Sequence, residues 1–363
     1  MTLGLAAAQA NARLARAGSP LRIRLQIVDV AGKPEQALHE LRRLAAQGVR
    51  VFIGPESSSE VRAVRSAANS LGVVVISQGS TAHSLARPGD NVFRLVPDDL
   101  REGEAMVALL RRDGVRALAP IWRSDPGNAG LVASVRGRFN GAISSGVAYG
   151  TDTTDFAKTV ASLHTQVADL QARKAGKVAV YLAAFDEVAD LFHAAASDPM
   201  LSAVPWYGSD GVALTTRLVK NASAAAFAAA RDYPNPTLGL DATASARSAG
   251  LRARIRARLG AEPDAFALTT YDALQIVARA AQASGGTSAI VRFKRALARI
   301  AHGYQGVTGR IVLNAAGDRA YGSFDFWSVC RSGGGFTWRR TTSYLASGVG
   351  RGHIVTRQAC RRR

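Results

Sequence analysis

Apolar residues in the first part of the chain recur at two different spacings, which predicts strands alternating with helices. Over residues 21–28 nearly every second residue is apolar, the period of a strand with one buried face. Residues 35–47 and 59–70 carry apolar positions three and four apart, and a glycine follows each within two residues, as it often follows a helix. Short apolar runs at 49–53 and 73–76 predict buried strands of a parallel sheet.

The alternation continues through a strand at 205–208, and the pattern changes after residues 232–236. We expect helices at residues 101–112, 129–139, 156–174 and 187–196, and strands at 117–122, up to Tyr149, at 178–182 and at 205–208. Three helices follow at 243–259, 266–283 and 289–301, and the end is strand-like at 309–313 and 322–329, with glycines 333–335 as a turn. Alternating strands and helices are typical of an α/β fold with parallel sheets. The late strands are distant in sequence from both parallel sheets. We expect these strands to return to one of the two sheets.

The length and composition predict a globular protein of two domains. A chain of 363 residues exceeds what one hydrophobic core usually supports. Hydrophobic residues at 47% and charged residues at 20% are ordinary for such a protein. No apolar run reaches the length that a membrane-spanning helix needs.

The formal charge of +19 raises the possibility of nucleic-acid binding. Arginine supplies most of this charge and is scattered along the whole chain, with denser groups only at residues 252–258 and 361–363. No helix-turn-helix, zinc finger or RNA-binding aromatic strand accompanies them. We therefore predict no nucleic-acid partner.

The two cysteines, Cys330 and Cys360, and the six scattered histidines do not have metal-ligand spacing, so we predict no metal and no cofactor. A disulfide between the two cysteines is expected if the protein is exported, and two unpaired thiols are expected if it stays in the cytoplasm. The sequence alone leaves both alternatives open.

Polar residues follow three of the predicted strands at the edge where parallel sheets bind ligands. Ser57 and Ser58 follow the strand at 49–53, although Ser57 with Glu60 also fits a capping box, which needs only one serine. Gly79, Ser80 and Thr81 follow the strand at 73–76. Asp210 follows the strand at 205–208 between two glycines, where its carboxylate could meet an ammonium group or begin a turn.

The order of these segments resembles the type I periplasmic binding proteins of the Leu/Ile/Val-binding class. The resemblance rests on Gly-Pro-Glu-Ser-Ser at 54–58, Ser-Gln-Gly-Ser-Thr at 77–81 and Trp-Tyr-Gly-Ser-Asp-Gly at 206–211. It continues through residues 125–131, 149, 155–156, 271–273, 306–309 and 317–319, and so spans nearly the whole chain. It implies two Rossmann-like lobes with parallel sheets, joined by crossover hinges, that close on a small ligand. The partners it implies are an amino acid or related amide and the membrane permease of an ABC importer.

The resemblance also implies a role for individual residues. Ser58 and Thr81, beside Ser80, would hold the ligand carboxylate, and the Gly79 carbonyl would meet its ammonium group. Asp210 would lie opposite that ammonium group. Three aromatic residues complete the implied site, with Phe185 against the ligand and core packing as the alternative for the other two, Trp122 and Tyr149.

Members of this family open with a strand that this sequence lacks. We therefore expect a translation start upstream of Met1, and a periplasmic or extracytoplasmic protein whose signal peptide is not visible.

The lobes are expected at residues 1–116 with 237–306 and at 117–236 with 307–345, followed by a tail at 346–363.

Two other functions are alternatives to this one. An enzyme is disfavoured, because no phosphate loop, nucleophile elbow or zinc-binding helix is present and no histidine is placed to act as a base. A cytoplasmic ligand-sensing regulator of the same fold remains as the alternative. It would need a partner or a DNA-binding segment, and neither end of the chain shows one.

Overall fold

A computed structural model describes residues 1–240, 242–260, 263–357 and 360 of the chain. These residues divide into two compact units, which we call unit 1 (residues 1–98 and 240–322) and unit 2 (residues 99–239 and 323–363). The predicted arginine group at 361–363 lies outside the described residues.

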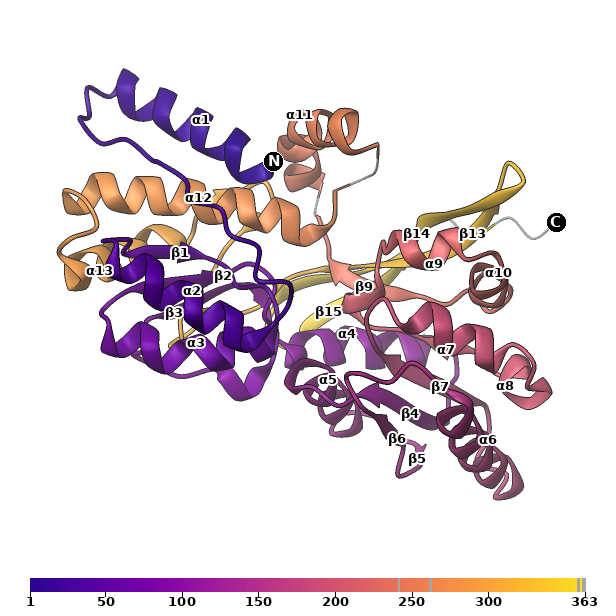
Figure 1. The fold of residues 1–363 in the computed structure, drawn as a ribbon. Helices are drawn as coiled ribbons and strands as arrows, with labels where there is room; N and C mark the ends of the chain where they lie inside the picture. The colour runs from indigo at the N-terminus through magenta and orange to yellow at the C-terminus, as the bar shows by residue number, and fades with distance from the viewer. Residues whose placement is uncertain (241, 261–262, 358–359, 361–363) are drawn as a thin grey trace. The chain divides into compact units, whose positions relative to one another are not determined.

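Unit 1 is built around a four-stranded parallel sheet in the order β1-β2-β3-β12, the first three of which are labelled in Figure 1. Its strands are β1 (Val51–Ile53), β2 (Val74–Ser77), β3 (Val92–Pro97) and β12 (Asp318–Arg319). Its helices are α1 (Thr2–Arg16), α2 (Pro34–Ala46), α3 (Ser58–Ser70), α11 (Ala242–Leu259), α12 (Ala265–Ser284) and α13 (Ile290–Ala301), with a short 3-10 helix η1 (His83–Leu85). A two-stranded ribbon joins β10 (Gln305–Gly306) to β11 (Gly309–Arg310).

Helices cover both faces of this sheet because side chains alternate along each strand. Val73 and Val75 belong to the apolar cluster that includes α2 and α3, and Val74 and Ile76 belong to the cluster that includes α12 and α13. All four side chains are buried. The continuous apolar run at 73–76 is therefore the pattern of a parallel strand buried on both sides, as the sequence predicts.

Unit 2 contains a second parallel sheet in the order β5-β4-β7-β8, in which β6 also pairs with β4. Its strands are β4 (Ala117–Arg123), β5 (Ala142–Ile143), β6 (Val147–Tyr149), β7 (Val178–Ala183) and β8 (Trp206–Tyr207). Its helices are α4 (Asp99–Arg112), α5 (Pro126–Arg136), α6 (Ala157–Ala172), α7 (Val188–Ala195), α8 (Pro199–Ala203), α9 (Thr216–Lys220) and α10 (Ala222–Ala230), with a 3-10 helix η2 (Asp210–Val212).

An antiparallel sheet completes unit 2 in the order β15-β14-β13-β9. Its strands are β9 (Asn235–Leu238), β13 (Phe324–Ser332), β14 (Gly335–Gly348) and β15 (Arg351–Thr356). The predicted glycine turn connects β13 to β14, and Gly333 and Gly334 adopt φ angles of 54° and 83°, which favour glycine.

The strand expected at 309–313 joins neither parallel sheet, because only Gly309 and Arg310 form a strand, β11, and it pairs with β10. The late strand that does return to the parallel sheet of unit 1, beside β3, is β12, which the sequence did not predict. β13 joins neither parallel sheet, contrary to the expectation from sequence, because it pairs with β9 and β14.

The boundaries between the two units differ from those expected from the sequence at 116, 236 and 306. α4 packs on α5 and so belongs to unit 2, whereas β12 pairs with β3 and keeps the residues up to 322 in unit 1. Residues 351–356 form β15 of the antiparallel sheet rather than a separate tail.

The prediction of a strand at residues 21–28 is wrong. The segment lies in unit 1 with the alternating exposure of a strand, but the structure assigns it neither strand nor helix. A strand requires a hydrogen-bonded neighbour, and β1 pairs only with β2 among the described residues.

The question of the two cysteines is answered by a disulfide that joins Cys330 on β13 to Cys360. Their Cα atoms are 5.4 Å apart. The bond ties the end of the chain to the antiparallel sheet of unit 2. Among the described residues, no helix combines the length and the apolarity that crossing a bilayer would take.

Candidate functional site

The first predicted site segment lies where β1 leads into α3 in unit 1. Ser57 is the N-cap of α3, and its hydroxyl accepts a hydrogen bond from the Glu60 amide while the Glu60 side chain accepts one from the Ser57 amide. The predicted capping box is therefore confirmed. Because Ser57 performs the capping, the neighbouring Ser58 is available for another role at the same helix N-terminus, where the helix dipole favours an anion.

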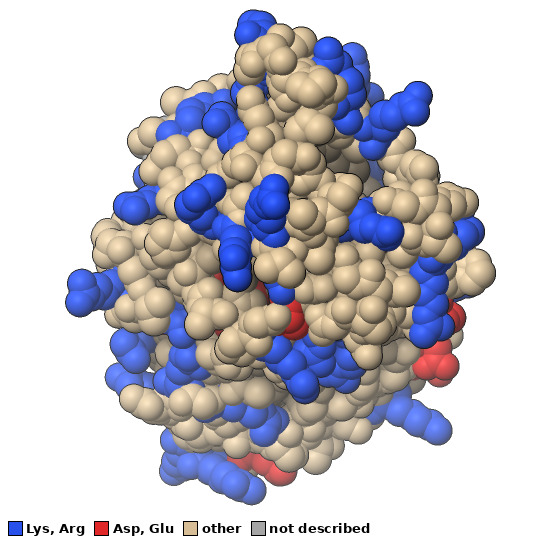
Figure 2. Space-filling model, turned by 90° about the vertical axis from the view of Figure 1, so that its left-hand side faces the viewer, with Lys and Arg blue, Asp and Glu red and all other residues tan. Residues whose placement is uncertain are grey.

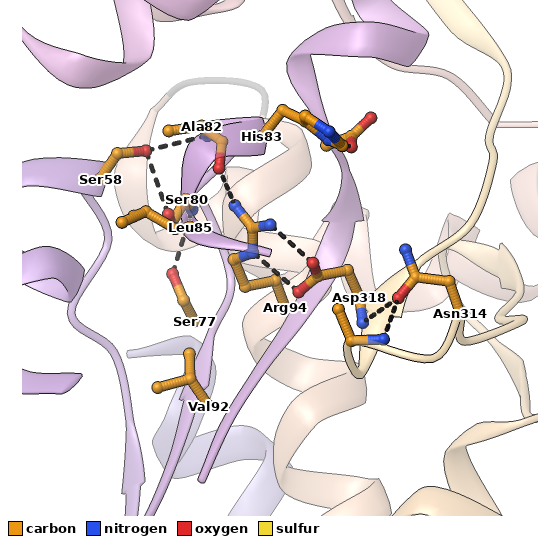
Figure 3. A network of polar contacts seen from close by, with 12 residues as sticks. Ser58, Ser77, Ser80, Ala82, His83, Leu85, Val92, Arg94, Asn314 and Asp318 are labelled. Carbon is orange, nitrogen blue, oxygen red and sulfur yellow. Dashed lines mark hydrogen bonds and ion pairs between the residues drawn. The ribbon is translucent and has the colours of Figure 1, made fainter. Parts of the chain in front are cut away.

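Ser58 connects this segment to the second predicted one. Its Oγ lies 3.0 Å from the Ser80 Oγ and accepts a hydrogen bond of 3.1 Å from the Ala82 amide (Figure 3). Ser58, Ser80 and Thr81 are all buried, with 8% or less of each residue exposed. Two segments 22 residues apart are thus brought together as a cluster of hydroxyl groups, as the sequence predicts for adjacent parallel strands.

Ser77 and Gly79 fix the distance between these two segments. The Ser77 hydroxyl donates to the Pro55 carbonyl at 2.7 Å and accepts from the Ser80 amide at 3.0 Å. A Cβ at Gly79 would lie 2.5 Å from the Glu56 Cγ, closer than real Cβ contacts come. Glycine at position 79 therefore permits the approach of one loop to the other.

A buried ion pair between Arg94 and Asp318 lies beside the hydroxyl cluster, and the sequence analysis did not predict it. The Arg94 guanidinium donates to both carboxylate oxygens of Asp318 at 2.7 and 2.6 Å, and it also donates to the Ala82 carbonyl at 2.6 Å (Figure 3). Asn314 accepts hydrogen bonds from the Asp318 and Ala316 amides and so shapes the turn that presents Asp318. Arginine in an otherwise apolar strand (Val92–Pro97) was the signal that could have found this pair.

The third predicted segment lies in unit 2, at the end of β8. The buried Ser209 hydroxyl contacts the main chain of Ala184, accepting from its amide at 3.2 Å and reaching its carbonyl at 3.4 Å. This contact ties the end of β8, which Asp210 follows, to the end of β7, which Phe185 follows. A Cβ at Gly211 would lie 2.6 Å from the Phe185 Cδ1, so glycine leaves the space that the ring occupies.

Asp210 stands beside further carboxyl groups that were not predicted. Its amide donates to the Glu102 Oε1 at 3.3 Å. Burial raises the pKa of the Glu102 carboxyl well above its ordinary value of 4.5, and the nearby Asp210 and Asp99 raise it further. Glu102 therefore tends to keep its proton, which limits the negative charge that gathers around Asp210.

The two looser candidates, Trp122 and Tyr149, lie in apolar clusters of unit 2. Tyr149 is buried against Phe156, with ring centroids 5.2 Å apart, and its hydroxyl donates to Glu187 at 2.8 Å. Trp122 is half-buried, and the Arg136 guanidinium lies 5.6 Å from its ring centroid. Both thus have packing roles, and ligand binding by either stays a prediction.

The model of one protein family, the receptor family ligand binding region, matches residues 2–332, which is most of the chain. The chain belongs to this receptor ligand-binding family. A curated relative, the uncharacterized protein MJ1266 of Methanocaldococcus jannaschii, is 26% identical over 336 residues and aligns with 87% of this chain and 78% of its own length.

Solved structures share the fold of this receptor ligand-binding protein. The branched-chain amino acid transporter substrate binding protein LivJ from Streptococcus pneumoniae, solved with isoleucine, has a TM-score of 0.72 at 19% identity and covers 97% of this chain and 93% of its own. The leucine binding protein LivK from Thermotoga maritima has a TM-score of 0.73 at 16% identity, with 92% of each chain covered. A solute binding protein of an ABC transporter from R. palustris, solved with benzoate, has a TM-score of 0.70 at 18% identity and covers 99% and 94%. The fold is that of the type I periplasmic binding proteins, as predicted.

Basic side chains do not gather into one patch on the face of the protein that Figure 2 shows. Lys and Arg lie dispersed among uncharged residues there, as their scattered positions in the sequence predict. A phosphate backbone is usually met by a stripe or patch of such residues. This face therefore provides no support for nucleic-acid binding.

Proposed function

We propose that this chain is the extracytoplasmic solute-binding component of an ABC importer and that its ligand is an amino acid or a related small carboxylate. The hydroxyl cluster of unit 1 would hold the carboxylate, and Asp210 of unit 2 would meet the ammonium group. Phe185 would pack against the body of the ligand. Binding without chemical conversion is proposed, in keeping with the binding proteins that share the fold.

The observation that carries the proposal is the geometry around Ser58. Its oxygen already accepts a hydrogen bond from the Ala82 amide, so its own O–H is left to be donated. Without ligand, the Ser80 oxygen, 3.0 Å away, can accept this hydrogen bond. A ligand group that is a stronger acceptor would replace it. A carboxylate at the N-terminus of α3 is such an acceptor, because hydrogen bonds to ionised groups are the stronger ones. Thr81 would add a second hydroxyl, and the Gly79 carbonyl would face the ammonium group.

The class of ligand depends on whether the ammonium group is recognised. Structural relatives were solved with isoleucine and with benzoate. Both ligands carry a carboxylate, but only isoleucine carries an ammonium group. We propose the amino acid, because Asp210 follows β8 at the end where parallel sheets present their ligand contacts. Cys330–Cys360 supports the extracytoplasmic location, since disulfides persist mainly in oxidising compartments. A permease of an ABC importer is the proposed partner.

Calorimetric titration with the twenty amino acids, their amides and benzoate tests this function. Ser58→Ala should weaken binding of every carboxylate at least about tenfold, the effect of one to two lost hydrogen bonds to a charged group. Asp210→Asn should weaken binding of amino acids to a similar degree but spare benzoate. Ser70→Ala, at the exposed end of α3, and Asp169→Asn, on the exposed face of α6, are the matched controls. Amino acids that bind Asp210→Asn as tightly as the unchanged chain would remove Asp210 from the site.

A further inference from the structure

The strand β4 of unit 2 ends in an arginine, at the edge of the sheet where the proposed ligand contacts of this unit lie. On one face of the strand, Ala117, Ala119 and Ile121 are fully buried in an apolar cluster. Arg123, two residues beyond Ile121, continues this face at the C-terminal end of the strand, and 27% of its side chain is exposed. Ligands of open parallel sheets bind at this end. Arg123 thus presents a cation at the edge where ligands bind.

The guanidinium of Arg123 lies over Phe185, the aromatic residue that the proposed function places against the ligand. Its Cζ is 5.2 Å from the centroid of the Phe185 ring, within the range of a cation–π contact. Phe185 follows β7, which pairs in parallel with β4, so the two strand ends are neighbours. A guanidinium that lies over a ring keeps the N–H groups of its rim available, and these match the two oxygens of a carboxylate.

The Nε of Arg123 is a buried donor without an acceptor in the described part of the chain. The Asp125 Oδ2 lies 4.0 Å from this nitrogen, which is too far for a hydrogen bond. Asp125 has other donors because it caps α5. Its carboxylate accepts from the Gly127 amide at 3.0 Å and from the amide and side chain of Asn128 at 3.1 and 2.7 Å. Buried N–H groups are normally paired, so a missing partner indicates a place for a ligand.

A second carboxylate of this region, Glu187, is also held by other donors. It accepts a hydrogen bond from the Tyr149 hydroxyl at 2.8 Å and one from the Phe185 amide at 3.2 Å. Arg123 and Glu187 both act on Tyr149: burial raises the pKa of its hydroxyl, Glu187 raises it further and Arg123 lowers it. The two carboxylates around Arg123 thus fix Tyr149, Phe185 and the start of α5. A carboxylate of the ligand would supply the hydrogen-bond acceptors that Arg123 lacks.

We propose that Arg123 is a specificity-determining residue and that the ligand is an amino acid with an acidic side chain. This inference rests on the proposed function, in which the hydroxyl cluster holds the α-carboxylate and Asp210 meets the ammonium group. The Arg123 guanidinium would bind the side-chain carboxylate through two parallel N–H groups. Phe185, beside it, would pack on the methylene groups of the ligand.

A neutral ligand side chain in the same place is disfavoured. An apolar one would cover the N–H groups of Arg123 and remove them from water without supplying an acceptor. An amide would supply one acceptor but no negative charge, and hydrogen bonds between two ionised groups are the stronger ones. We therefore expect glutamate or aspartate to bind most tightly, glutamine and asparagine less tightly, and leucine least.

Calorimetric titration of the full chain with glutamate, aspartate, glutamine, asparagine and leucine tests the inference. The preferred acidic amino acid should bind at least about tenfold more tightly than its amide. Arg123→Gln should weaken binding of the acidic amino acid about tenfold to a hundredfold and binding of the amide by no more than about threefold. Arg123→Lys keeps the charge without the planar fork, so its affinity for the acidic amino acid should be intermediate.

The matched control is Arg331→Gln. Arg331 belongs to the same unit, and its Cζ also lies 5.2 Å from a phenylalanine ring, that of Phe336. It is exposed near the end of β13, so its replacement should leave the affinity for every amino acid unchanged. Circular dichroism and retained binding of the amide show that Arg123→Gln is folded.

Failure of this inference differs from failure of the proposed function. If leucine binds as tightly as glutamate and aspartate while Ser58→Ala weakens all three, the proposed function stands and this inference alone is overturned. Unchanged binding of the acidic amino acids in Arg123→Gln, or an equal loss for the acids and their amides in a folded variant, would show that Arg123 only packs on Phe185 and would also overturn it. If no amino acid binds the unchanged chain, the proposed function fails and this inference fails with it.

Discussion

Arg94 and Asp318 form a bidentate ion pair in the interior of unit 1, although 224 residues separate them in the chain. Arg94 is 1% exposed and Asp318 3%. The pair joins β3 to β12, and the same guanidinium holds the Ala82 carbonyl, whose residue donates its amide to Ser58. The hydroxyl cluster therefore depends on a contact between the two distant parts of the chain that build unit 1.

We predict that Arg94→Gln destabilises unit 1 by about 3–5 kcal/mol, because it leaves the Asp318 carboxylate buried without the guanidinium. The four tryptophans, Trp122, Trp206, Trp327 and Trp338, all lie in unit 2. Denaturant unfolding followed by circular dichroism reports both units, and tryptophan fluorescence reports unit 2, so the loss should be seen by circular dichroism alone.

The matched control for this prediction is Arg112→Gln, which breaks a more exposed pair with Asp113 at 2.7 Å. Surface pairs of this kind contribute about 1 kcal/mol or less. A loss from Arg94→Gln no larger than that of the control would show that the buried pair does not stabilise unit 1.

We predict that Glu102→Gln stabilises unit 2 increasingly as the pH rises from 4 to 8. Burial, Asp210 and Asp99 raise the pKa of Glu102 in the folded chain, so the folded state holds a proton that the unfolded state releases above about pH 4.5. The stability that this proton contributes is complete below the unfolded pKa and is lost as the pH rises through the folded one. Glutamine does not titrate and avoids the loss.

Unfolding midpoints from tryptophan fluorescence across this pH range measure the effect. Asp169→Asn removes an exposed carboxylate from α6 of the same unit and should follow the pH dependence of the unchanged chain. A constant difference between Glu102→Gln and the unchanged chain at every pH would contradict the prediction.

Gly211→Ala should displace Phe185, because the added Cβ would lie 2.6 Å from both the Ala184 carbonyl and the Phe185 ring. Overpacking of this kind costs about 1–3 kcal/mol. Fluorescence-detected unfolding should show the loss in unit 2, and calorimetry should show weaker ligand binding. Gly335→Ala, where the nearest atom is 3.9 Å away, should be neutral in both measurements. Full ligand affinity in Gly211→Ala would argue against a ligand contact by Phe185.

Removal of the disulfide by the double substitution Cys330→Ala and Cys360→Ala should destabilise unit 2 by about 3 kcal/mol, since the bond closes a loop of 30 residues in the unfolded chain. A reducing agent should lower the stability of the unchanged chain to a similar degree and leave the double variant unaffected. If the reducing agent changes neither protein, the bond does not contribute to stability.

The sequence by itself determined the elements whose signals are local. The helix expected at residues 59–70 is α3 (Ser58–Ser70), and its capping box forms as predicted, because an N-cap and its partner lie three residues apart. The strand expected at 73–76 is β2, displaced by one residue. The polar residues after these strands could also be assigned to one cluster, since parallel strands end at the same edge of a sheet.

Only the tertiary structure decided which distant segments meet. Residues 21–28 have the pattern of a strand and form none, because a strand exists only with a neighbour to pair with. The partner of Arg94 and the pairing of Cys330 with Cys360 likewise depend on contacts across long stretches of chain. Periodicity and spacing report how a segment can bury its own side chains, but the pairing of segments depends on the packing of the whole unit.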